Sequence, residues 1–75
     1  MATTCKGITA KLKTEGLPVS MYKGSGYFYF EFDQGKVFET HSVYVNSINQ
    51  LTADEWLKEG RDFAKNVREQ YGIGE

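Results

Sequence analysis

Residues 27 to 32 read YFYFEF, and this run of five aromatic residues in six positions constrains the fold more than any other part of the chain. Side chains on a β-strand alternate between its two faces. A strand here would separate the phenylalanines from the tyrosines: Phe28, Phe30 and Phe32 against Tyr27, Tyr29 and Glu31. A fully buried phenylalanine contributes roughly 1.5 to 3 kcal/mol, which a small domain cannot spare for a ligand. We predict that the three phenylalanines belong to the core.

The length and composition predict one globular domain over residues 1–75. The chain is 40% hydrophobic and 25% charged, as folded proteins commonly are. A domain of this size buries only about 60% of its unfolded surface, which leaves little room for an enzyme cleft. Cys5 and His41 could in principle act as nucleophile and base, but a single cysteine is more often a small core residue. One histidine and one cysteine also offer no metal cluster, so we expect no catalytic residue, metal or cofactor.

Charge and cysteine content predict the setting. The net charge is −1 and the isoelectric point is about 5.8, whereas a dedicated nucleic-acid binder usually has a basic excess. The single cysteine cannot form an internal disulfide, which suits a reducing cytoplasm. No apolar run is long enough for a signal peptide or a membrane span. We expect a soluble cytoplasmic protein that does not enter membranes.

Residues 53–71 have the pattern of an amphipathic helix. Thr52 and Glu55 have the spacing of a capping box at its start, and Gly72 can end it in the left-handed conformation. Apolar residues recur at spacings of three and four along one stripe: Trp56, Gly60, Phe63, Val67 and Tyr71. Gly60 within this stripe predicts a close approach of the helix to a sheet.

Residues 4–15 fit two patterns. Ile8 and Leu12 agree with the alternation of a strand or, together with Cys5, with one stripe of a helix. The sequence EGLP that follows is typical of a helix end, with a glycine, an apolar residue and a proline. We favour a helix over about 4–15.

Three strands are predicted between the helices, over about 18–23, 27–32 and 36–45, with a GSG turn at 24–26 and a hairpin loop at Asp33-Gln34-Gly35. If Val43 and Val45 face the core, strict alternation would turn Glu39 and His41 inward as well. A β-bulge near Glu39-Thr40-His41 would resolve this conflict, because one extra residue exchanges the faces. The sequence therefore predicts an α+β fold of order α-β-β-β-α, a three-stranded antiparallel meander with both helices packed on one face.

The same alternation gathers four tyrosines on the sheet face opposite the helices: Tyr22, Tyr27, Tyr29 and Tyr44. Tyrosine is enriched at interfaces because it is apolar with a polar tip. It also has a high strand propensity and pairs well across strands, so the cluster has a purely structural explanation too. We take the four tyrosines and the neighbouring Lys23 as the candidate binding site.

The run from Lys23 to Phe30, KGSGYFYF, approaches the signature of the RNA recognition motif. The third position of that signature must be aromatic to stack a base, and here it is Ser25. Too few residues precede the run for the strand and helix that this fold requires. We therefore reject the RNA recognition motif.

The α-β-β-β-α order resembles the double-stranded-RNA-binding domain, which docks through basic residues at the start of its second helix. Ala53-Asp54-Glu55 occupies that place and would repel phosphate. A weak nucleic-acid-binding protein, with contacts from Lys6, Lys13 and Lys23, is our alternative hypothesis.

Small mRNA-interferase toxins on the same fold place a histidine just after a K-G-S element. Here Gly26 follows that element, and His41 lies elsewhere. A degenerate toxin of this kind is a third and weaker hypothesis.

The C-terminal helix also has a basic stripe, interleaved with acidic residues: Lys58, Arg61, Lys65 and Arg68 with Asp54, Asp62 and Glu69. Pairs spaced by four, such as Asp54 with Lys58, predict a solvated face rather than a binding site.

Taken together, several segments resemble a group of small phage and prophage proteins of unknown function. They are GLPV at 16–19, KGSGYFYF at 23–30, SVYV at 42–45, and Leu51-Thr52 followed by Trp56. The resemblance covers about residues 8–60 and implies a phage-derived accessory protein. Our leading hypothesis is a non-enzymatic interaction module whose tyrosine face binds a protein or a second copy of the chain.

Overall fold

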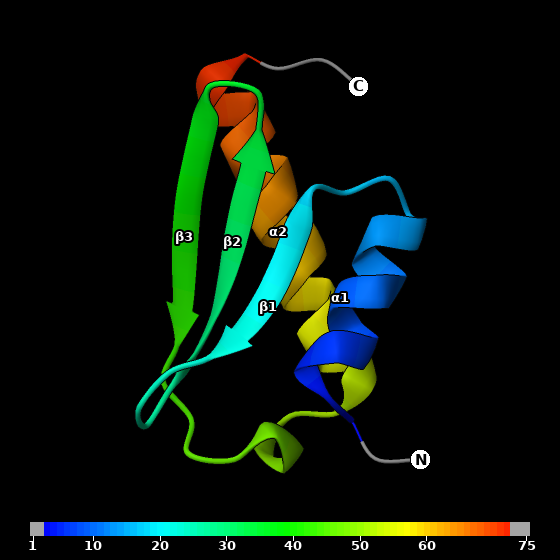
Figure 1. Cartoon of the computed structure of the whole chain (residues 1–75), viewed down its shortest axis with the longest axis vertical. Coiled ribbons are helices and arrows are strands. Elements are labelled where there is room, and N and C mark those ends of the chain that lie inside the picture. Colours follow the sequence, from blue (N-terminus) through cyan, green and yellow to red (C-terminus); the bar gives the residue numbers. More distant parts are fainter. Residues whose placement is uncertain (1–2, 73–75) are drawn as a thin grey trace.

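The computed structural model describes residues 3–72. Along the chain lie α1 (Cys5–Thr14), β1 (Val19–Lys23), β2 (Phe28–Gln34), β3 (Val37–Val43), the 3₁₀-helix η1 (Ile48–Gln50) and α2 (Ala53–Tyr71). The strands form an antiparallel sheet in the order β1-β2-β3 (Figure 1). The predicted α+β class, the element order and the meander are confirmed.

α1 has a defined beginning and end. The Thr4 hydroxyl accepts a hydrogen bond from the backbone at its start. After the helix, Gly16 has φ of 80°, and the Leu17 N–H donates to the Leu12 carbonyl at 3.0 Å. This is the Schellman arrangement that the EGLP sequence indicates. The helix predicted over 4–15 is therefore confirmed, and the strand alternative is wrong.

α2 begins at the predicted capping box. The Thr52 hydroxyl accepts from the Glu55 N–H at 3.2 Å, and the Glu55 carboxylate accepts from the Thr52 N–H at 2.9 Å. These bonds satisfy backbone donors that have no partner within the helix. Gly72 ends the helix with φ of 65°, as predicted.

The 3₁₀-helix η1 is an element that the sequence analysis missed. Ser47 and Gln50 form a second capping box around it, so the signal was present in the S-x-x-Q spacing. The Trp56 Nε1–H donates to the Ile48 carbonyl at 2.7 Å, which attaches η1 to the start of α2.

The strand register separates the two faces of the sheet as the sequence predicts. Phe28, Phe30 and Phe32 are buried, and the strand pairing sets Phe30 beside Met21. Residues from both helices and two strands share the one core: Ile8, Leu12, Val19, Met21, Phe28, Phe30, Phe32, Trp56, Leu57, Phe63, Ala64 and Val67.

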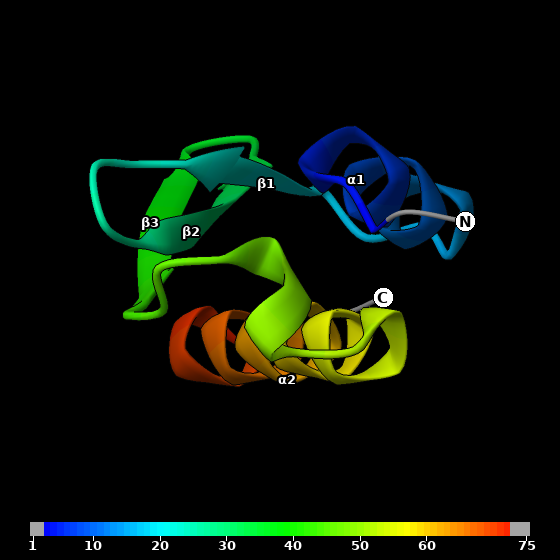
Figure 2. The ribbon, with the colours of Figure 1, turned by 90° about the horizontal axis from the view of Figure 1, so that it is seen from below.

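The two helices reach this core from different directions. α2 lies across the phenylalanine face, while α1 runs along the β1 edge of the sheet (Figure 2). The Met21 N–H of β1 donates to the Thr9 hydroxyl of α1 at 2.8 Å, so the helix satisfies part of that edge. A Cβ on Gly60 of α2 would lie 2.7 Å from Cδ1 of Leu12 and 3.2 Å from Cε1 of Phe30. Gly60 thus allows the predicted approach to the sheet and, in addition, an approach to α1.

The predicted β-bulge in the third strand is wrong. Every residue from Val37 to Val43 is paired with one residue of β2, without an insertion. Glu39 and His41 consequently do face the α2 side, but at the margin of the core. There the Glu39 carboxylate accepts from the Tyr71 hydroxyl of α2. An edge strand can turn polar residues inward in this way, because helix side chains and solvent satisfy them.

The hairpin between β2 and β3 is tighter than predicted. Asp33 and Gln34 remain in the strand, paired with Phe38 and Val37, so the turn is Gly35-Lys36 rather than Asp33-Gln34-Gly35. Gly35 has φ of 61°, which a glycine adopts without strain.

Within residues 3–72, no helix has the length and apolarity needed to cross a membrane.

Candidate functional site

The four predicted tyrosines form one continuous row, with Tyr22 on β1, Tyr29 on β2, Tyr27 just before β2 and Tyr44 just after β3. Tyr22 stacks on Tyr29, with ring centroids 5.4 Å apart. Tyr27 then lies 6.0 Å from Tyr29 and 6.0 Å from Tyr44. The row crosses the end of the sheet that carries the β1–β2 hairpin, the lower end in Figure 1. Separations of this size are those of interacting aromatic pairs.

The hairpin glycines explain how the row is packed. The Gly24 N–H donates to the Tyr27 carbonyl at 2.8 Å, which closes the turn. A Cβ built on Gly24 would overlap the Tyr27 ring, so this ring lies directly over the glycine. The turn itself is Ser25-Gly26, with Gly26 at φ of 77°. The KGSG segment therefore positions the middle of the tyrosine row.

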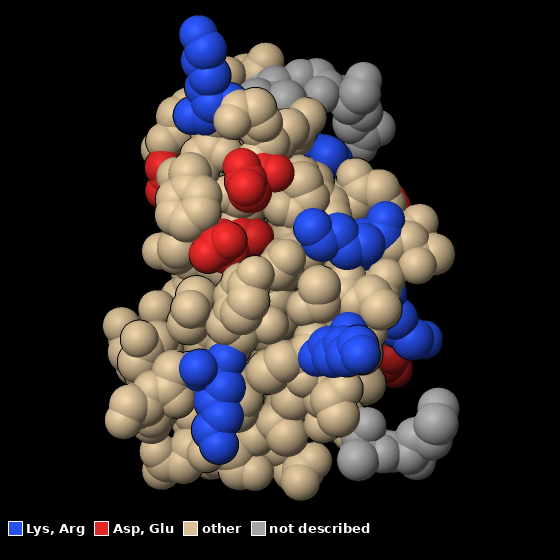
Figure 3. Space-filling view, in the orientation of Figure 1, with Lys and Arg blue, Asp and Glu red and all other residues tan. Residues whose placement is uncertain are grey.

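The row is accessible. Tyr44 is 82% exposed and Tyr22 is 42% exposed, while Tyr27 and Tyr29 are half-buried by their neighbours. Figure 3 views the sheet from the side opposite α2, and most of the surface there is uncharged. Acidic side chains interrupt it over the upper part of the sheet, and the alternation of β2 puts Glu31 and Asp33 on this face.

Phe38 is an aromatic residue of this face that the sequence analysis missed. It is paired with Asp33, which puts it on the tyrosine side of the sheet, and it is 57% exposed. The assumed bulge concealed it, because a bulge would have turned Phe38 toward the core. Continuous alternation through β3 is the signal that would have found it.

Lys23 does not belong to the tyrosine row. It is paired with Phe28 and shares the helix-facing side of β1 with Val19 and Met21. Burial of the Cys5 thiol has the largest effect on its pKa and raises it, while the nearby charge of Lys23 has a smaller, lowering effect. Its place in the candidate site is therefore a correction: the row consists of Tyr22, Tyr27, Tyr29 and Tyr44 without Lys23.

Cys5 and His41 are not brought together. Cys5 packs against the core from the start of α1, at the β1 edge. His41 is on β3 at the opposite edge, where its ring stacks on Phe63 with centroids 5.6 Å apart. The arrangement gives no support to a nucleophile and base formed by these two residues.

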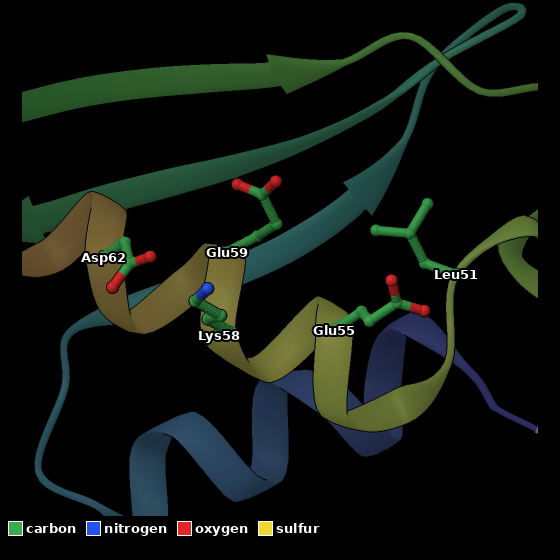
Figure 4. A pocket seen from close by; sticks show the side chains of 5 residues that line it. All are labelled: Leu51, Glu55, Lys58, Glu59 and Asp62. Atoms are coloured by element: carbon green, nitrogen blue, oxygen red, sulfur yellow. The ribbon is translucent and has the colours of Figure 1, made fainter.

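An open hollow of about 250 Å³ lies along α2, lined by Leu51, Glu55, Lys58, Glu59 and Asp62 (Figure 4). Two of its three carboxylates, those of Glu55 and Glu59, have structural partners. Glu55 belongs to the helix cap, and its hydrogen bonds from the Thr52 backbone hold its pKa below the usual value. Glu59 lies 3.6 Å from the His41 imidazole. Within residues 3–72, no group of three histidine, cysteine or acidic side chains is arranged to hold a metal ion.

The basic stripe on α2 is only partly the solvated face that its spacing predicts. Lys65 and Glu69 form an ion pair at 4.0 Å, whereas Arg61 forms two hydrogen bonds, of 2.7 and 2.6 Å, to the Glu15 carboxylate at the end of α1. Arg68 also reaches the end of α1, with its Nη2 3.4 Å from the Gly16 carbonyl oxygen. Two of the four basic residues thus connect the helices and are not available to a ligand.

Comparisons with known proteins found no match: no protein-family model, no curated protein and no solved structure is significantly similar to the chain.

Proposed function

We propose that the protein is a non-enzymatic interaction module whose tyrosine row binds a segment of a partner protein. The observation that carries the proposal is the continuous contact from Tyr22 through Tyr29 and Tyr27 to Tyr44 on an open sheet face. Tyrosine rings offer large rigid apolar area at a low cost in conformational entropy. The resemblance of the sequence to small phage proteins suggests that such a module acts as a phage-encoded accessory protein.

The neighbouring charges indicate the chemistry of the partner segment. Glu31 and Asp33 share the face with the tyrosines, and carboxylates at this place disfavour phosphate. Arginine and lysine side chains are attracted both to carboxylates and to the faces of aromatic rings. The preferred partner is therefore a segment that combines apolar residues with arginine or lysine.

A peptide display experiment tests this proposal. Panning a random-peptide library against the protein should select basic, partly apolar peptides, whose affinity is then measured by fluorescence anisotropy. Tyr29→Ala should weaken their binding by about 2 kcal/mol, roughly thirtyfold, because it removes the ring that joins both neighbours in the row. Tyr44→Ala should weaken binding less, since only one ring contacts it.

Tyr71→Ala is the matched control. Tyr71 is 46% exposed, much like Tyr22 at 42%, but it belongs to α2 and contacts β3 rather than the row. The Tyr71→Ala substitution should leave the affinity for the selected peptides unchanged. Selected peptides that bind Tyr29→Ala as tightly as the original protein would contradict the proposal, and light scattering at each step distinguishes peptide binding from self-association.

A second candidate function is weak nucleic-acid binding through α1. One observation favours it: α1 carries three lysines and no acidic residue, and basic side chains gather over it in Figure 3. Lys6 and Lys13 are exposed. Single- and double-stranded oligonucleotides at low salt should then bind, and Lys6→Glu with Lys13→Glu should abolish the binding. Absence of binding at low salt would exclude this function, because phosphate contacts are strongest there.

A further inference from the structure

We propose that the free edge of β3 pairs antiparallel with β3 of a second copy of this chain, joining two three-stranded sheets into one. This self-association uses backbone groups of the sheet edge and does not depend on the tyrosine row. The open edge of the sheet, the backbone groups that point outward from it and the order of side chains along β3 all support this pairing.

Only one edge of the sheet is open within residues 3–72. α1 lies along β1 and accepts a hydrogen bond from the Met21 N–H through Thr9. β3 pairs with β2 on one side, and no part of the described chain lies beyond it on the other side in Figure 1. An exposed strand edge presents unpaired N–H and C=O groups to another strand.

The hydrogen-bond pattern identifies these groups. In an antiparallel sheet, the N–H and C=O of one residue point to one neighbouring strand, and those of the next residue point to the other. The Asp33 N–H donates to the Pro18 carbonyl at 3.0 Å, so the odd-numbered residues of β2 point to β1. The even-numbered residues of β2 therefore point to β3, where they face its odd-numbered residues. The residues whose groups point to the open edge are Phe38, Thr40 and Ser42.

One symmetric register uses all of these groups. When Thr40 faces the partner's Thr40, Phe38 faces the partner's Ser42 and Ser42 faces the partner's Phe38. Each outward N–H then meets an outward C=O, as a two-fold symmetric interface requires. A register centred on Glu39 or on His41 leaves outward groups unpaired at its ends. The former would also set two glutamates opposite each other, which is unfavourable.

The side chains of β3 are complementary to themselves in the Thr40 register. Glu39 faces the partner's His41, and His41 faces the partner's Glu39, so carboxylate and imidazole meet twice. Val37 likewise faces the partner's Val43, which adds an apolar pair at each end. In both of these facing pairs the two residues form no backbone hydrogen bonds with each other. Side chains approach each other most closely in pairs of this kind. The His41 side chain is 43% exposed in the single chain, so a partner can contact it.

Thr40→Pro tests the central hydrogen bonds. Proline has no N–H but is tolerated on an edge strand where that N–H faces outward. Sedimentation velocity over a wide concentration range should show a monomer–dimer equilibrium for the original protein. We expect dimerisation to weaken about tenfold or more in Thr40→Pro, and to change little in Thr40→Ala, which keeps the N–H. Circular dichroism checks that the variants are folded.

A charge exchange tests the register independently. Glu39→Lys removes the carboxylate that faces the partner's His41, and His41→Glu creates two pairs of facing glutamates. Each variant alone should dimerise more weakly, whereas the double variant Glu39→Lys/His41→Glu sets a lysine opposite a glutamate twice and should recover the dimer. Glu69→Lys, on the exposed surface of α2, is the control for the change in net charge.

Amide hydrogen exchange locates the contact. The N–H groups of Phe38, Thr40 and Ser42 should become protected as protein concentration rises, while protection of Glu39 and His41 is already present in the monomer. Tyr29→Ala should leave the dimer intact, which separates this inference from the proposed function. A protein that stays monomeric at all concentrations, a dimer unaffected by Thr40→Pro, or a double variant that fails to recover would overturn it.

Discussion

The position of a single ring decides the shape of the tyrosine row. Tyr27 connects Tyr29 and Tyr44, and its ring occupies the space that a side chain at Gly24 would need. The φ angle of Gly24 is not in the left-handed region, so the glycine is required by the neighbouring ring rather than by the backbone. At the residue scale, the function proposed here depends on this absence of a side chain.

Gly24→Ala should therefore displace the Tyr27 ring and break the row while the fold persists. We expect the NMR signals of the Tyr29 and Tyr44 rings to shift, because both lose a neighbouring aromatic ring, and binding of the selected peptides to fall roughly tenfold. Ser25→Ala, one residue away, should leave both unchanged. Ring signals in Gly24→Ala that match those of the original protein would show that Tyr27 does not depend on the glycine.

At the scale of elements, the residues at the two ends of α2 favour a helix, whereas one residue in its middle disfavours it. Its capping box and its terminal glycine favour the helix, whereas Gly60 in its middle disfavours it by about 1 kcal/mol relative to alanine. The close approach of Leu12 and Phe30 explains this residue, since both side chains are fully buried there. Packing between elements thus outweighs helix propensity at this position.

Gly60→Ala should destabilise the protein by about 1 kcal/mol. The added methyl overpacks the core, at a cost of about 1 to 3 kcal/mol, and this exceeds the gain in helix propensity of about 1 kcal/mol. Urea denaturation measures the difference. Asn66→Ala, at an exposed position of the same helix, should be neutral or slightly stabilising. In a double-mutant cycle, Leu12→Ala should remove most of the penalty, and an additive cycle would argue against the contact.

At the scale of the whole molecule, Glu15 and Arg61 join residues far apart in the sequence. The guanidinium donates to both carboxylate oxygens, and this hydrogen bonding lowers the pKa of Glu15 from its ordinary value of 4.5. The pair connects the end of α1 to the middle of α2. It thereby supports the position of α1 beside β1, where the helix covers one edge of the sheet and, among the residues that the structure describes, leaves β3 as the open one.

The lowered pKa of Glu15 predicts an acid-dependent loss of stability. A carboxylate whose pKa is lower in the folded state stabilises the fold above its unfolded pKa, and this contribution is lost as the pH falls through the folded value. Glu15→Gln should therefore lower the thermal unfolding temperature near neutral pH, and this difference should disappear as the pH falls below the ordinary carboxyl pKa and through the lowered folded pKa. Glu69→Gln is the control, because its ion pair with Lys65 is long and exposed. A difference between Glu15→Gln and the original protein that stays constant with pH would contradict this account.

Features that depend on residues close together in the chain could be predicted from the sequence. The alternation in YFYFEF separated core phenylalanines from surface tyrosines, and the residues around Thr52 and Gly16 defined helix ends. These predictions succeeded because a strand repeats every two residues and a cap spans one helical turn.

Features that depend on residues distant in the chain became known only from the folded molecule. The fold placed α1 along the β1 edge and kept β3 free of the bulge that its polar residues suggested. Glu39 and His41 can face α2 because Tyr71 and Glu59 meet them there. The pattern within a strand predicts which residues share a face, but the neighbour that covers this face comes from elsewhere in the chain. For this reason neither the unbroken register of β3 nor its open edge could be derived from the sequence alone.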